Sequence, residues 1–119
     1  MKEHFRCRNE GDWTVVEFLA PDMTDLVELE SIHNDLTRHM DTKKAHHIIL
    51  DFAKVKFVSS KALVIVLDLS KKLGALPHSR LVLCSVPPTI MELLKTLRLD
   101  RILKIVGTQK EAIALAAPA

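Results

Sequence analysis

One stretch of this sequence constrains the fold more than any other, because it joins a strand, a short loop and a helix within residues 48–73. The apolar run Ile48–Leu50 has the length of a buried strand, and a longer apolar run of helical length begins at Ala62. The adjacent serines Ser59 and Ser60 fall where this helix is expected to begin. A helix start presents free backbone N–H groups and the positive end of the helix dipole, so the position suits a phosphate group.

The residues before this stretch predict a β-hairpin followed by one long amphipathic helix. Phe5 and Cys7 alternate with polar residues as in a strand, and the β-rich segment 13–19 is expected to return beside it after a turn at 9–12. Asp22 is predicted to cap the helix, with Asp25 in its first turn. The apolar residues of this helix recur at steps of three and four: Leu26, Leu29, Ile32, Leu36 and Met40. A polar connection at 41–45 then leads to a strand at 46–52.

The residues after the central stretch continue the alternation of helices and strands. Gly74 is expected just past the end of the central helix, and residues 80–85 form a strand. Pro87 and Pro88 open the next helix, and residues 103–106 form a short edge strand. Thr108 and Glu111 match a capping box at the start of a last helix. The order β, β, α, β, α, β, α, β, α predicts a single α/β domain over residues 1–119, with a mixed, mostly parallel sheet, an N-terminal β-hairpin and about four helices.

Composition excludes several classes of function. A net charge of +2 without a basic cluster does not suit a nucleic-acid surface, so no nucleic-acid partner is expected. The three glycines are isolated and form no phosphate-binding loop, so no nucleotide cofactor is expected. The two cysteines lie far apart, which argues against a disulfide or zinc site and fits a reducing cytoplasm. No run approaches the roughly 18 apolar residues of a membrane span, and the N-terminus lacks a signal peptide, so we expect a cytoplasmic protein that does not insert into membranes.

Catalysis is not expected either. The sequence has no nucleophile elbow, and no convincing base lies near Ser59 or Ser60. His46 and His47 are adjacent on a predicted strand, so they point to opposite faces and do not share a metal ion. We therefore expect a binding protein without a catalytic or metal site.

The order of elements and the segment LDFAKVKFVSSKAL, residues 50–63, resemble the STAS domain of anti-sigma-factor antagonists. In this resemblance Asp51 matches the aspartate at the strand end, Phe57 the loop phenylalanine, Ser60 the phosphoacceptor serine and Leu63 the first leucine of the helix. The likeness covers residues 5–115 and includes a last helix with an EA pair. It implies the STAS fold and a role in regulating a sigma factor.

The segment departs from the family pattern at three places. Ala53 replaces the serine of the strand-end motif, Ser59 replaces the aspartate before the acceptor, and Lys61 with Ala62 replaces the second serine and the glycine. Because Ser59 also carries a hydroxyl, it is an alternative acceptor, and the motif alignment favours Ser60.

The resemblance implies that the unmodified domain binds a partner that is both an anti-sigma factor and a serine protein kinase, as a monomer or weak dimer. Phosphorylation of Ser60 then ends the binding. The candidate partner-binding residues are Asp51, Ser59, Lys61 and Val64. Val64 falls on the narrow polar stripe of the central helix beside Lys61, so we expect it to be exposed.

Four alternatives stay open at the level of sequence, two for the domain and two for single residues. The domain could be a STAS accessory subunit of a lipid-transport ABC ATPase, docking through the same helix face. It could also be an interaction domain in which Ser59 and Ser60 only cap the helix. At single residues, Val64 could be an isolated surface valine, and Asp51 at a strand end could be a metal or phosphate neighbour as in receiver domains.

Overall fold

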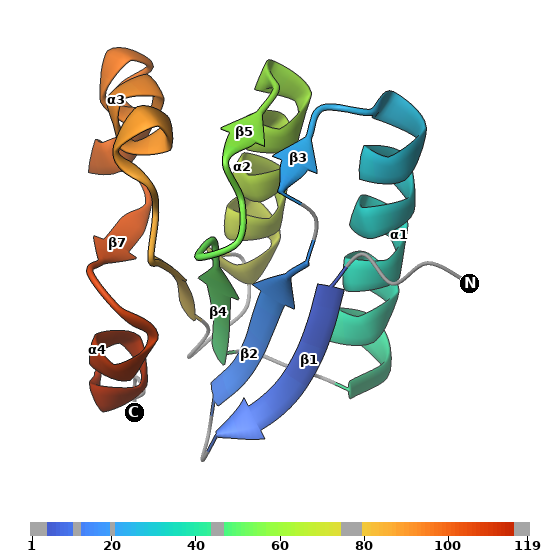
Figure 1. Ribbon diagram of the computed structural model, residues 1–119. Helices are drawn as coiled ribbons and strands as arrows, with labels where there is room; N and C mark the ends of the chain where they lie inside the picture. Colours follow the sequence, from blue (N-terminus) through green and yellow to red (C-terminus); the bar gives the residue numbers. More distant parts are fainter. Residues whose placement is uncertain (1–4, 11–12, 20, 44–46, 75–79, 116–119) are drawn as a thin grey trace.

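A five-stranded sheet in the order β1-β2-β4-β6-β7 organises the protein (Figure 1). In the computed structural model, which describes residues 5–10, 13–19, 21–43, 47–74 and 80–115, β1 and β2 form an antiparallel hairpin and the other neighbours in this sheet are parallel. The strands are β1 Phe5–Glu10, β2 Trp13–Phe18, β4 His47–Asp51, β6 Arg80–Cys84 and β7 Lys104–Val106. The predicted mixed, mostly parallel sheet with an N-terminal hairpin is confirmed.

Within the described residues, four α-helices connect or follow these strands, as the sequence predicts. They are α1 Leu26–Lys43, α2 Ser60–Gly74, α3 Pro88–Thr96 and α4 Gln109–Ala114, with a short 3₁₀ helix, η1 Leu99–Arg101, after α3. Parallel strands need crossover connections, and α1, α2 and α3 supply them between β2, β4, β6 and β7 in turn. In Figure 1, α1, α2 and α3 stand in a row, and α4 lies apart from them below β7.

The sheet carries a core on each face, because successive residues of a strand point to opposite sides. Ile48 and Leu50 of β4 join the larger core with α1, α2 and α3, whereas Ile49 between them joins a smaller core beneath α4. The smaller core consists of Trp13, Val15, Ile49, Val82, Cys84 and Ala112. Burial on both faces explains why the central strands are almost continuously apolar in sequence.

A second, two-stranded sheet lies beside the start of α2 and was not predicted from sequence. It pairs β3, Asp22–Met23, in parallel with β5, Phe57–Val58. The pairing continues on both sides of these strands, because the backbone N–H of Phe57 donates to Pro21 O at 3.1 Å and that of Ser59 donates to Met23 O at 3.1 Å. This small sheet fixes the chain immediately before the serine pair.

The start of α1 differs from the prediction. Asp22 was predicted as the N-cap, which is wrong, because its backbone is part of β3. Asp25 caps the helix instead: the backbone N–H of Glu28 donates to Asp25 Oδ1 at 2.9 Å. The helix also runs to Lys43, so the first residues of the predicted connection at 41–45 are helical.

The C-terminal elements agree closely with the sequence patterns. Helix α3 begins at Pro88 after Pro87, and β7 lies at the edge of the sheet. At the start of α4, the Thr108 hydroxyl accepts a hydrogen bond from the Glu111 N–H at 3.1 Å. The Glu111 carboxylate in turn accepts one from the Gly107 N–H at 3.2 Å, so the capping box closes one residue earlier than the standard pattern. Gly11 and Asp12, in the predicted turn at 9–12, lie outside the described residues.

Candidate functional site

Ser59 is the N-cap of α2. Its carbonyl oxygen accepts a hydrogen bond from the Leu63 N–H at 3.3 Å, and its side-chain Oγ accepts one from the Ala62 N–H at 3.3 Å. The residue is half-buried. The hydroxyl oxygen of Ser59 therefore caps the N-terminus of α2, which is the usual role of serine at this position.

Ser60 is the first residue of α2 and is exposed. Within the described part of the chain, its hydroxyl makes no hydrogen bond. The first turn of α2 contains no acidic side chain, so the positive end of the helix dipole is not compensated there. A group added to the Ser60 oxygen would enter solvent at the positive end of the helix.

Lys61 and Val64 continue the exposed side of α2. The Lys61 Nζ lies 3.0 Å from Glu30 Oε1 on α1, and one turn beyond Val64 the Asp68 carboxylate lies 2.8 Å from His33 Nε2. Val64 is spaced three residues from Lys61 and four from Asp68, and it is 56% exposed. The exposure predicted for Val64 is confirmed. The Asp68 carboxylate also forms an ion pair with Lys72 on the same helix, at 3.2 Å. We call Ser60, Lys61 and Val64 the α2 surface.

Asp51 lies at the end of β4 and points inward. It is only 7% exposed, and its carboxylate accepts hydrogen bonds from the Ala53 N–H at 2.8 Å and the Gln109 Nε2 at 2.6 Å. These bonds hold the loop after β4 and attach the start of α4 to it. Gln109 was missed in the sequence, because no local pattern links two residues that are 58 positions apart. That Asp51 contacts a partner stays a prediction, and its burial places it behind the surface rather than on it.

Two groups around these elements have displaced pKa values. The hydrogen bond to His33 lowers the pKa of Asp68 from its ordinary value of 3.8. Partial burial opposes this shift, and the nearby Lys72 adds to it. Burial raises the pKa of the Cys84 thiol to about 12, and the neighbouring Asp51 carboxylate adds to that rise. Cys84 is therefore a protonated core residue and not a nucleophile.

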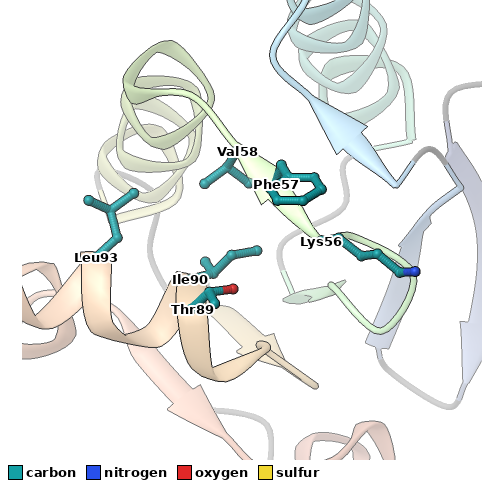
Figure 2. A pocket seen from close by; sticks show the side chains of 6 residues that line it. All are labelled: Lys56, Phe57, Val58, Thr89, Ile90 and Leu93. Atoms are coloured by element: carbon teal, nitrogen blue, oxygen red, sulfur yellow. The ribbon is translucent and has the colours of Figure 1, made fainter.

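A small open pocket lies next to the α2 surface. Figure 2 shows Phe57 and Val58 of β5 on one side and α3 on the other, with Lys56 at the edge. Six residues line it: Lys56, Phe57, Val58, Thr89, Ile90 and Leu93. We call it the β5–α3 pocket. Sequence reasoning missed it, although the aromatic and β-branched pair at residues 57–58 is a signal for a short strand.

Other kinds of site find little support in the described residues. Among them, no group of three or more His, Cys, Asp or Glu side chains is placed to hold a metal ion. No helix in the described ranges combines the length and hydropathy needed to cross a bilayer.

Comparison with solved structures shows the same fold in bacterial proteins. An anti-sigma-factor antagonist (STAS) domain protein from Planctomyces limnophilus has a TM-score of 0.80 and 23% identity, covering 92% of this chain and 93% of that one. A Thermotoga maritima protein has a TM-score of 0.79 and 21% identity over 92% and 91% of the two chains. The Bacillus cell fate determinant SpoIIAA in its phosphorylated form has a TM-score of 0.70 and 21% identity over 92% and 96%. At these identities the likeness establishes the fold.

Comparison at the sequence level identifies the family. No curated protein matches the chain. The family model described as the STAS domain matches residues 21–112, which include both serines, the α2 surface and the β5–α3 pocket. The chain therefore belongs to the STAS domain family.

Proposed function

We propose that this protein is an anti-sigma-factor antagonist of the cytoplasm, whose partner is an anti-sigma factor with serine kinase activity. The unmodified protein binds the partner through the α2 surface and so frees a sigma factor. The partner transfers the γ-phosphate of ATP to the Ser60 oxygen, the Ser60 proton leaves, ADP is released, and the complex dissociates.

The different surroundings of the two serines support Ser60 as the acceptor. The Ser60 hydroxyl is exposed and makes no hydrogen bond within the described residues, whereas the Ser59 hydroxyl accepts the Ala62 N–H and is half-buried. A kinase must align the acceptor oxygen with the γ-phosphate. Ser60 meets this requirement without loss of a helix cap, and Ser59 does not.

The physical basis of the switch is the charge of the phosphate. Phosphorylation adds about −1.5 to −2 charges at pH 7. At the start of α2 that charge is tolerated, because the helix dipole contributes about 0.3–1 kcal/mol to an exposed anion there. At an interface the same charge loses its hydration, and each loss of about 1.4 kcal/mol weakens binding tenfold. The fold therefore survives a change that ends the complex.

The test is to incubate the protein with ATP and each candidate anti-sigma factor kinase encoded in the same genome, and to measure intact mass followed by peptide mapping. We expect one added phosphate on wild type and on Ser59→Ala, and none on Ser60→Ala. Unmodified wild type should bind the kinase, and the phosphorylated form should bind at least about tenfold more weakly by isothermal titration calorimetry.

Other outcomes would assign the protein elsewhere. Phosphate on Ser59 alone would move the acceptor by one residue. If neither serine is modified by any of these kinases, and an ABC ATPase copurifies with the protein, the accessory-subunit alternative is favoured. Equal kinase affinity of the modified and unmodified forms would contradict the switch.

A further inference from the structure

The β5–α3 pocket is continuous with the α2 surface. Val58 lines the pocket and is two residues before Ser60, which places their Cα atoms within about 7 Å of each other. Phe57, also in the lining, is 64% exposed. The pocket therefore lies near enough in the chain for a partner that reaches Ser60 to contact it as well.

The size and lining of the pocket fit one apolar side chain. Its volume is about 130 Å³. An apolar cavity of about 150 Å³ is large enough for a benzene-sized group. Figure 2 shows Phe57 and Val58 across from Ile90 and Leu93, so the walls are apolar on both sides. The occupant is therefore an apolar side chain of the size of leucine or phenylalanine.

The β5 side of the pocket is basic, while α3 carries one exposed carboxylate, Glu92, beside the lining residue Leu93. Lys54 and Lys56 are exposed and make no ion pair within the described residues. Neither α2 nor α3 has an acidic residue in its first turn, and the N-cap of α3, Pro87, makes no side-chain hydrogen bond to the helix. The nearby carboxylate of Asp22, which is in register with Phe57, accepts a hydrogen bond from the Thr24 hydroxyl. Charge complementarity favours carboxylates beside the apolar anchor.

We propose that the β5–α3 pocket binds a segment of the partner in which a leucine or phenylalanine lies between acidic residues. This inference rests on the proposed function, since the partner is the protein that reaches Ser60. The apolar side chain fills the pocket, and the acidic residues pair with Lys54 and Lys56 and face the start of α3.

The test is a titration of the isotope-labelled full chain, observed by NMR, with a short glycine–serine peptide that carries one phenylalanine between two glutamates. We expect shifts at Phe57, Val58, Thr89 and Leu93, with a dissociation constant on the order of 1 mM for so small a probe. A peptide with lysines for the glutamates, and one with alanine for the phenylalanine, should each bind about tenfold more weakly or worse. No shift at these residues, or equal binding of the lysine peptide, would overturn the proposal.

Two variants locate the binding, each with a matched control. Thr89→Phe places a ring at the exposed mouth of the pocket and should abolish the shifts, whereas Lys95→Phe, exposed on the other side of α3, should not. Lys56→Glu should weaken the acidic peptide about tenfold at low salt and less at high salt. Lys71→Glu, near the far end of α2, should have no effect. Identical responses of test and control variants would place binding outside the pocket.

The peptide experiment also separates this inference from the proposed function, because it involves neither kinase nor phosphate. Peptide binding without phosphorylation of Ser60 would overturn the switch and retain the pocket. Phosphorylation without peptide binding would do the reverse. If the same residues shift with protein concentration alone, the pocket is occupied by a second copy of the chain, and the proposal is wrong.

Discussion

Ser59 and Ser60 are neighbours in the chain, yet their side chains have different surroundings. The oxygen of Ser59 accepts a backbone hydrogen bond three residues along α2, and the oxygen of Ser60 faces solvent. Ser59 therefore caps the helix, and the side chain of Ser60 is exposed to solvent. The departure from the family motif, serine in place of aspartate at position 59, keeps the capping function, because serine and aspartate are equally good N-caps.

The capping role of Ser59 has a measurable consequence. We expect Ser59→Ala to lower the free energy of unfolding by about 1 kcal/mol, because the Ala62 N–H loses its acceptor. Ser60→Ala should change it by less than about 0.5 kcal/mol, as at most surface sites. Urea unfolding followed by circular dichroism measures both. Ser59→Asp serves as the control, since a carboxylate restores the cap. Equal effects of the two alanine variants would contradict this division of roles.

At the scale of elements, α1 and α2 are joined by polar contacts on either side of an apolar residue. Lys61 pairs with Glu30 and Asp68 with His33, and Val64 lies exposed between them along α2. These contacts hold the α2 surface against α1 without covering it. The apolar side chain of Val64 thereby stays exposed.

Replacing Val64 tests whether that side chain contributes to binding. We expect Val64→Glu to weaken binding of the proposed partner kinase at least tenfold, because a carboxylate would replace an apolar side chain at the proposed interface. The melting temperature should change little, since Val64 is 56% exposed. Titration calorimetry and thermal unfolding measure the two quantities, with Lys71→Glu on the same helix as the control. A large loss of stability would mean that Val64 packs more closely than its exposure indicates.

The contact between Asp68 and His33 predicts a dependence of stability on pH. Because the folded-state pKa of Asp68 lies below its ordinary value of 3.8, its contribution is complete above that value and is lost as the pH falls through the lower folded pKa. Asp68→Asn should therefore be less stable than wild type at neutral pH, and the difference should shrink in acid. Since the side chain is 39% exposed, the effect is small.

Urea unfolding of wild type and Asp68→Asn across the acid range measures this difference. His33→Ala should remove most of the same acid-dependent part, because the His33 hydrogen bond is the largest cause of the shift. A stability difference that stays constant from neutral pH into strong acid would refute this assignment.

On the scale of the whole molecule, the proposed acceptor Ser60 lies outside both cores. Ser60 belongs to neither the core under α1, α2 and α3 nor the smaller core under α4. Trp13 in the smaller core is 4% exposed, and its indole N–H donates to Leu115 O at 3.3 Å. A charge added at Ser60 therefore changes a surface without disturbing the packing that holds the sheet and helices together.

The variant Ser60→Asp examines this separation of surface and core. We expect Trp13 fluorescence and the melting temperature to match those of wild type. Kinase binding should fall about tenfold or more, as we propose for the phosphorylated form. Ser60→Ala should bind the kinase constitutively. Equal kinase affinity of the two variants, or a shift of Trp13 emission in Ser60→Asp, would contradict the expectation.

The sequence by itself determined the elements whose signals are local. Apolar periodicity predicted the larger strands and the four helices. The residues around Pro88 and Thr108 marked two helix starts, because these signals lie within a few residues of each start. The serine pair at the start of α2 could also be recognised, because an N-cap depends on residues only three positions apart.

Only the tertiary structure decided features that depend on contacts between distant segments. The pairing of β3 with β5 took Asp22 out of the helix cap, and the Asp51–Gln109 hydrogen bond turned a candidate surface residue inward. The β5–α3 pocket likewise needs two elements that are some thirty residues apart in sequence. Strands of two residues carry almost no periodic signal, and which side chains meet across a fold depends on packing that no local pattern records.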